Sequence, residues 1–284
     1  MLNKYPYSWP CHETSCISYL TNISVFRDLR YRDRYLLGRF LIKLLVSIKH
    51  VDELENAIYG GANIVDVKDP SKGSLGLPDF EVLKNIVTKI RIMNIDDIEI
   101  SMAGGDVKEY DHSLKYVTYI AASLNIDYFK IGLAMSSRET AKFVSKEVSK
   151  TLKLLNTTKL VLVGYADYSR IESIEPLEII DIAEEARANV VMIDTYIKDG
   201  RTTFNFLSKN YLQEFVEKAH RKGLLAALAG SLKKYHVADT IKLGFDIIGV
   251  RGAVCKGDRR GFISRELVAE LKKVIEHYSG IMSV

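Results

Sequence analysis

The sequence has few cysteines and no long apolar run, and both absences limit what the protein can be. Three cysteines, Cys11, Cys16 and Cys255, are too few for a disulfide framework, which favours a reducing compartment. The sequence contains no run of about 18 apolar residues, so we expect no membrane span. Its first residues lack the apolar core of a signal peptide. We therefore expect a cytoplasmic protein that does not enter a membrane.

Most of the chain has almost no net charge. Its net charge is +4, and residues 1–41 contribute +3 of this through six basic and three acidic residues. The remaining residues are close to neutral, so they lack the basic face that nucleic-acid binding requires. We expect a small-molecule substrate and no nucleic-acid partner; the sequence does not decide the oligomeric state, and a homo-oligomer is compatible with it.

Several well-known catalytic patterns are also missing. The chain has no phosphate-binding P-loop and no Ser-His-Asp order. Cys11, His12 and Cys16 are closely spaced, but they lack a fourth ligand and a folded context for a metal. We expect neither a metal ion nor a cofactor.

The chain divides at about residue 42. Residues 1–41 are aromatic and proline-rich at the start and Arg-rich later, without any strand–helix unit. Three interpretations of them stay open: an appendage, a partner-binding arm, or sequence upstream of the true start. Residues 42–284 alternate regularly between short apolar runs and amphipathic stretches, which predicts one catalytic domain.

The apolar runs are rich in Val, Ile and Leu, which is typical of strands buried on both faces. There are eight of them: Leu44–Ile48, Ile64–Val67, Ile98–Ala103, Tyr128–Leu133, Leu160–Gly164, Val190–Asp194, Leu224–Ala229 and Ile247–Val250. The stretches between them have helical length and include Val51–Tyr59, Phe80–Ile92, Ser136–Leu154, Pro176–Arg187 and Leu212–Lys222, and Glu266–His277 predicts a last helix. Eight strand–helix units in this length favour a closed (β/α)₈ TIM barrel. A doubly wound sheet would want a Gly-rich turn after its first strand, and Lys49–Asp52 contains no glycine.

Ionisable residues gather where these strands end, which is where such barrels hold their active sites. Strand alternation places Val65 and Val67 against the helices and turns Asp66 and Lys68 inward. The same argument turns Lys130 and Asp194 inward, and Lys198 follows four residues after Asp194. Burial disfavours the ammonium form, so an inward lysine can supply a neutral amine for Schiff-base chemistry while carboxylates move protons. Buried lysine–aspartate ion pairs at a rim are the alternative interpretation.

The ends of the last two strands have the composition of a phosphate site. Gly230, Ser231, Arg251 and Gly252 supply backbone amides beside small residues and a guanidinium. Ordinary turns are the alternative. The segment 257–261 is most simply a polar loop, although it could border the phosphate site.

Nine sequence blocks resemble the (5-formylfuran-3-yl)methyl phosphate synthase family of methanofuran biosynthesis in methane-producing archaea. They are Leu44–Ser47, Gly60–Lys68, Gly73–Gly76, Gly105–Val107, Asp127–Leu133, Gly164–Asp167, Asp194–Thr195 with Lys198–Gly200, Ala227–Ser231 and Gly249–Cys255. The charged segment after Val107 departs from the family pattern, and residues 1–41 lie outside the match.

The resemblance implies an activity and separates the roles of the lysines. The family condenses two molecules of glyceraldehyde 3-phosphate to 4-(hydroxymethyl)-2-furancarboxaldehyde phosphate, with loss of phosphate and two waters, as a carbon–oxygen lyase. By resemblance, Lys68 forms the Schiff base, Lys130 accepts a proton, and Asp66, Asp194 and Lys198 support them. Two rivals remain: another Schiff-base barrel aldolase that acts on a sugar phosphate, and a scaffold or RNA-associated protein that uses its basic first 41 residues.

Overall fold

The computed structural model describes residues 42–95, 97–155 and 157–281. Eight parallel strands close into a barrel in which each strand pairs with its neighbours in chain order, and β8 pairs with β1. The strands are β1 (Lys43–Ile48), β2 (Ile64–Val67), β3 (Glu99–Val107), β4 (Tyr128–Leu133), β5 (Lys159–Tyr165), β6 (Val190–Asp194), β7 (Leu225–Leu228) and β8 (Ile247–Val250). The predicted (β/α)₈ barrel is confirmed.

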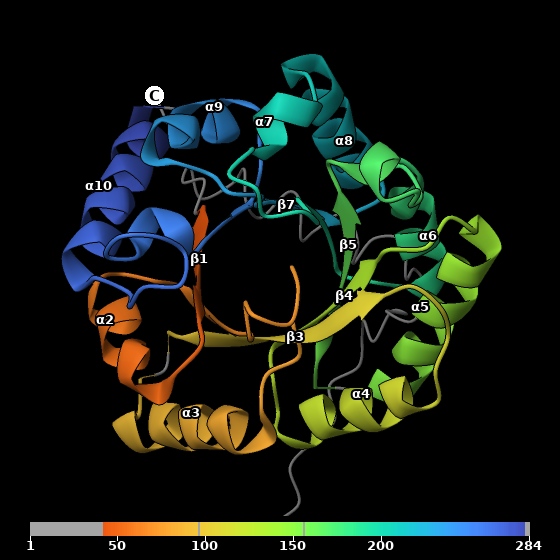
Figure 1. Cartoon of the computed structure of the whole chain (residues 1–284), viewed down its shortest axis with the longest axis horizontal. Coiled ribbons are helices and arrows are strands. Elements are labelled where there is room, and N and C mark those ends of the chain that lie inside the picture. The colour runs from red at the N-terminus through yellow and green to blue at the C-terminus, as the bar shows by residue number, and fades with distance from the viewer. Residues whose placement is uncertain (1–41, 96, 156, 282–284) are drawn as a thin grey trace, which may run out of the picture.

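Helices surround the barrel on the outside, as the view down its axis shows (Figure 1). The described α-helices are α2 (Leu54–Tyr59), α3 (Phe80–Met93), α4 (Ser113–Ser123), α5 (Arg138–Leu152), α6 (Glu178–Ala186), α7 (Thr203–Phe206), α8 (Lys209–Arg221), α9 (Val237–Lys242) and α10 (Arg265–Ile281). Short 3₁₀ turns are η1 (Val51–Glu53), η2 (Tyr168–Arg170), η3 (Lys234–His236) and η4 (Gly252–Val254). The predicted helix Val51–Tyr59 is therefore a 3₁₀ turn that continues into α2.

Side-chain caps explain where two of the predicted helices begin. The hydroxyl of Ser208 accepts a hydrogen bond from the backbone N–H of Tyr211, so α8 begins at Lys209 rather than at Leu212. The hydroxyl of Ser137 likewise accepts from the N–H of Thr140, and α5 begins at Arg138. Each cap satisfies one N–H that a helix leaves unpaired in its first turn.

Two apolar layers follow from the alternation of the strands. Val65 and Val67 of β2 pack into the larger cluster between the strands and the helices, together with Phe129 and Ile131 of β4. A smaller cluster fills the inside of the barrel and includes Leu45, Ile64, Leu75, Ala103, Tyr128, Val161, Val163, Val190, Met192, Ala227, Ala229 and Ile247. The predicted side-chain directions on β2 and β4 are thus confirmed, and the inward polar residues stand at the end of this inner cluster.

Strand β3 is longer than predicted and contains a bulge. Ala103 pairs with Lys130 and Asp106 pairs with Gly132. Between these two pairs β3 moves on by three residues while β4 moves on by two, so β3 contains one extra residue. Gly105 within this step has φ +108°, a conformation that suits glycine. The extra residue gives Asp106 the same inward face as Lys130.

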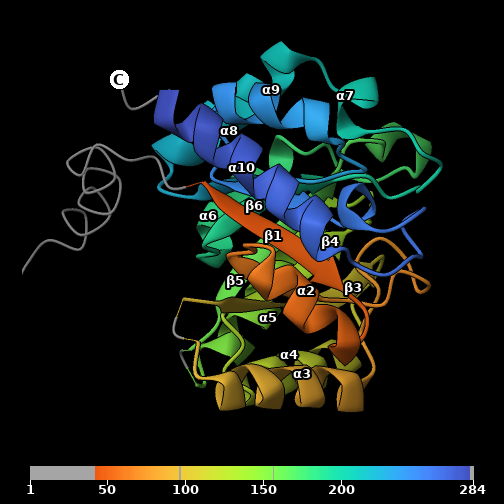
Figure 2. The same cartoon turned by 90° about the vertical axis from the view of Figure 1, so that its left-hand side faces the viewer.

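The loops that build the site leave one end of the barrel. In the side view, the loop after β2 and the loop after β8 extend from the same end, at the right of Figure 2. They are the carboxyl-terminal loops of a parallel barrel, where active sites of this fold occur.

Candidate active site

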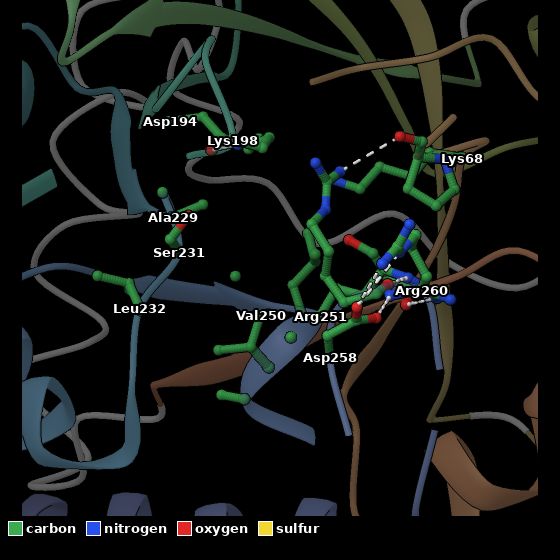
Figure 3. Close-up of a pocket in the computed structure, with 18 of the residues that line it drawn as sticks. Lys68, Asp194, Lys198, Ala229, Ser231, Leu232, Val250, Arg251, Asp258 and Arg260 are labelled. Carbon is green, nitrogen blue, oxygen red and sulfur yellow. Dashed lines mark hydrogen bonds and ion pairs between the residues drawn. The ribbon is translucent and has the colours of Figure 1, made fainter. Parts of the chain in front are cut away.

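A cavity of about 700 Å³ opens at this end of the barrel. Eight of the nine residues that the sequence predicted for the site line it: Lys68, Lys130, Asp194, Lys198, Gly230, Ser231, Arg251 and Gly252. The ninth, Asp66, is fully buried and bonds to one of the lining lysines. Figure 3 shows Asp194 and Lys198 on one side of this cavity and Arg251 on the other.

Lys68 follows directly after β2, and its side chain enters the cavity with only 7% of the residue exposed. Its Nζ donates a hydrogen bond to the carbonyl oxygen of Ser74 at 3.1 Å. Burial lowers the pKa of Lys68 to about 8, against the opposing effects of Asp194 and Asp66 and with help from two neighbouring lysines. At neutral pH this amine is therefore neutral far more often than a lysine in water.

Lys130 and Asp66 form an ion pair at the inner end of the site. The Nζ of Lys130 lies 2.6 Å from Oδ1 of Asp66, and both side chains are almost fully buried. The hydroxyl of Ser47 donates to the other carboxylate oxygen at 2.7 Å. Burial alone would raise the pKa of Asp66, but Lys130 and then Lys68 outweigh it and lower that pKa. The carboxylate is ionised and holds the lysine in place.

Asp194 and Lys198 form a second pair at the end of β6. The Nζ of Lys198 lies 2.5 Å from Oδ1 of Asp194, which also accepts the N–H of Thr195 at 2.7 Å. Burial opposes ionisation of Asp194, yet Lys198 and Lys68 lower its pKa. Two carboxylates, Asp66 and Asp194, and two further lysines, Lys130 and Lys198, thus surround Lys68, an arrangement that can move protons to and from a bound imine.

The turn after β7 offers backbone donors. Gly230 and Ser231 both have positive φ, of +95° and +53°. A Cβ added to Gly230 would lie 2.1 Å from the hydroxyl oxygen of Thr203, so the turn requires glycine. Among the described residues, neither Gly230 nor Ser231 uses its N–H in a hydrogen bond, which leaves two donors free at the cavity wall.

Arg251 lines the cavity, but its guanidinium is already engaged. It pairs with Glu53, with Nη1 and Nη2 at 3.2 and 3.1 Å from the two carboxylate oxygens. Its other donors bind the carbonyl oxygens of Ser47, Arg259 and Gly261 at 2.9, 2.8 and 3.2 Å. All five N–H groups have acceptors, so Arg251 joins η1 to the loop after β8 rather than pointing a free donor at a ligand.

Asp106 and Tyr165 take part in the site although the sequence did not single them out as site residues. The Asp106 carboxylate accepts the backbone N–H groups of Ser74 and Leu75 at 2.8 and 3.1 Å, and the hydroxyl of Tyr165 donates to it. Ser74 is the residue whose carbonyl oxygen binds Lys68. Asp106 therefore fixes the loop after β2 over the site; the signal available in the sequence was its position beside two glycines at the end of a strand.

Positive side chains dominate the lining of the cavity. Among the residues that the structure describes, two acidic ones line it, Asp194 and Asp258, against eight basic ones: Lys49, Lys68, Lys130, Lys198, Lys233, Arg251, Arg259 and Arg260. Such a lining favours anionic ligands and raises their local concentration.

Comparison with known proteins assigns the family. The model of the 4-HFC-P synthase family matches residues 44–272. The chain belongs to the 4-HFC-P synthase family. A curated relative from Methanocaldococcus jannaschii, named (5-formylfuran-3-yl)methyl phosphate synthase, is 43% identical over 235 residues, which are 81% of this chain and 98% of the relative. A relative of the same name from Methanopyrus kandleri is 39% identical over 237 residues, covering 82% and 98%.

Solved structures agree with the fold of this 4-HFC-P synthase family member. The 3-hexulose-6-phosphate synthase of Salmonella typhimurium superposes with a TM-score of 0.59 at 15% identity, over 84% of this chain and all of that chain. The thiamine phosphate pyrophosphorylase of Pyrococcus furiosus gives 0.55 at 15% identity, over 85% and 98%. At such identities the likeness concerns the fold alone.

The described residues contain neither a helix that could span a membrane nor a cluster of metal-ligating side chains. Within residues 42–95, 97–155 and 157–281, no helix is both long and apolar enough to cross a membrane. The same ranges contain no group of three or more His, Cys, Asp or Glu side chains placed to hold a metal ion. Cys11, His12 and Cys16, together with the proposed extension 1–41, lie outside the described residues.

Proposed function

We propose that the protein condenses two molecules of glyceraldehyde 3-phosphate to 4-(hydroxymethyl)-2-furancarboxaldehyde phosphate, releasing one phosphate and two waters. The observation that carries the proposal is Lys68, a buried amine with a pKa of about 8 in a cavity that favours anions. The printed names of the relatives support the furan phosphate as the product.

Lys68 is the residue that forms the covalent bond. Its neutral amine attacks the aldehyde carbon of one triose phosphate, and loss of water gives an imine. The ammonium of Lys198 is hydrogen-bonded to Asp194 and is placed to supply a proton to the departing hydroxyl.

Lys130 is the residue that accepts the carbon-bound proton. In the resting site it is paired with Asp66, so it acts as a base after giving its own proton to a bound intermediate. Removal of the proton next to the imine carbon gives an enamine, which adds to the aldehyde of the second triose phosphate. Loss of phosphate, ring closure and loss of two waters build the furan. Hydrolysis of the imine then frees Lys68 and returns the water that was lost when the imine formed, so two trioses give one furan phosphate, one phosphate and two waters.

The retained phosphate binds at the turn after β7 and the beginning of η4. Gly230, Ser231 and Gly252 all line the cavity, and the N–H groups of Gly230 and Ser231 have no hydrogen-bond acceptor among the described residues. Arg251 contributes indirectly, because its bonds to Glu53 and to the loop after β8 hold this wall in place.

Product analysis tests the proposal. Incubation with glyceraldehyde 3-phosphate should yield a compound with the mass and the near-ultraviolet absorbance of the furan phosphate. Lys68→Ala should abolish it. Lys72→Ala, which removes a half-exposed lysine of the same loop that does not line the cavity, should leave the rate unchanged. A product without furan absorbance would favour an aldolase that acts on another sugar phosphate.

A further inference from the structure

Arg259 differs from the other arginines of the cavity in what its guanidinium binds. It lies in the loop between β8 and α10 and lines the cavity. Among the described residues its guanidinium has a single hydrogen bond, a long one of 3.5 Å from Nη2 to the carbonyl oxygen of Pro70. One of its five N–H donors is therefore used and four are not, and a half-buried cation with four unused donors is a site for an anion.

Three hydrogen bonds hold the backbone around Arg259. Arg251 donates from Nε to the carbonyl oxygen of Arg259 and from Nη2 to that of Gly261. The base of the loop is closed by a bond from the N–H of Lys256 to the carbonyl oxygen of Phe262 at 2.9 Å. Because Arg251 is itself buried and paired with Glu53, these bonds connect the backbone of Arg259 to the barrel wall.

The positive charge of Arg259 lies in surroundings that would stabilise a bound anion. Burial lowers its pKa, and the positive charge of Arg251 acts in the same direction, while Asp194 opposes them. Arginine nevertheless stays charged in proteins, so the charge is held in a partly desolvated place without an ion-pair partner among the described residues. Its neighbour Arg260 is different, because its guanidinium is exposed and paired with Asp258 at 3.0 Å.

We propose that Arg259 binds a second phosphate group in the cavity, separate from the one at the Gly230–Ser231 turn. Its contact with Pro70 places the guanidinium between the loop after β8 and the loop after β2. Lys49, which also lines the cavity and is only loosely paired with Asp69 at 3.6 Å, adds charge on the β2 side. The assignment of this anion to the second triose phosphate rests on the proposed function; the presence of the anion site does not.

Calorimetric titration of the full-length protein with inorganic phosphate tests this site. The wild-type protein should bind two phosphates. Arg259→Ala should weaken one of them by at least about tenfold, the loss expected for a charge-assisted contact, and should leave the other unchanged. Lys256→Ala removes a positive charge from the same loop at an exposed residue that does not line the cavity, and should retain both sites. Unaltered binding in Arg259→Ala, or an equal loss in Lys256→Ala, would overturn the proposal.

Two further measurements separate this inference from the proposed function. Arg259→Ala should raise the KM for glyceraldehyde 3-phosphate, while borohydride capture of unphosphorylated glyceraldehyde should proceed as in the wild type. Equal slowing of borohydride capture with glyceraldehyde 3-phosphate and with unphosphorylated glyceraldehyde would mean that Arg259 acts on the amine rather than on phosphate, and would overturn the site. The wild-type protein could form no furan while Arg259→Ala still binds phosphate more weakly than the wild type. In that case the anion site stands and only the proposed reaction fails.

Discussion

Replacing Asp194 by Asn should lower the pKa of Lys68, which burial already lowers in the wild-type protein. With a pKa of about 8, Lys68 is neutral in roughly 10% of molecules at pH 7, against about 0.03% for a lysine at its ordinary value of 10.5. The barrel site thus raises the population of the nucleophile by roughly 300-fold. Asp194 is the largest of the effects that hold the pKa up, so its neutral replacement should move the pKa below 8.

The assay is a pH titration of lysine ¹³Cε signals by nuclear magnetic resonance, with Lys68 assigned through Lys68→Met. In the wild type the Lys68 signal should titrate near pH 8, well below exposed lysines such as Lys72. In Asp194→Asn the midpoint should fall. Below the midpoint, imine formation should drop about tenfold per pH unit because the ammonium form cannot attack. A Lys68 midpoint above about 10, or an upward shift in Asp194→Asn, would refute the reasoning.

Three substitutions test the structure around the site. Asp106→Asn should lower stability by about 1–3 kcal/mol, because an amide nitrogen cannot accept the donors that the carboxylate accepts, and kcat should fall more than KM rises. Arg251→Ala leaves Glu53 buried without its partner and should destabilise the fold by about 3–5 kcal/mol in urea unfolding. Gly230→Ala should cost more than about 1 kcal/mol, because its φ is +95° and the new Cβ meets Thr203, and it should weaken phosphate binding.

Matched controls accompany these substitutions. Asp111→Asn removes an exposed carboxylate shortly after β3 and should leave kcat unchanged, in contrast to Asp106→Asn. Arg260→Ala should not alter urea unfolding, unlike Arg251→Ala. Gly200 also has positive φ, of +94°, but a Cβ there meets nothing within 4 Å. If Gly200→Ala weakened phosphate binding as much as Gly230→Ala, the role assigned to the β7 turn would be wrong.

Strand alternation explains why part of the site could be predicted from the sequence. The side chains of β2 and β4 follow a strict period of two, so the apolar residues that pack on the helices identify Asp66, Lys68 and Lys130 as inward. The period of two is interrupted on β3. Simple alternation from Ala103 would turn Asp106 outward, but the bulge at Gly104 and Gly105 turns it inward.

Contacts between distant segments explain what the sequence could not reveal. Arg251 fits a phosphate site by its position after β8, but its partner Glu53 lies 198 residues away in a turn that nothing local marks as buried. Because Glu53 engages Arg251, the cavity arginine that keeps most of its donors unused within the described part of the chain is Arg259, in a segment that resembles an ordinary polar loop. Which arginine is free depends on the folded arrangement and not on local composition.

The central claim, that Lys68 is the covalent residue, is tested most directly by peptide mapping after borohydride reduction. The full-length protein, mixed with glyceraldehyde 3-phosphate and reduced, should carry a triose phosphate adduct on the peptide that contains Lys68, and the adduct should vanish in Lys68→Ala. An adduct on Lys130 or Lys198 instead, or furan formation that continues in Lys68→Ala, would contradict the account.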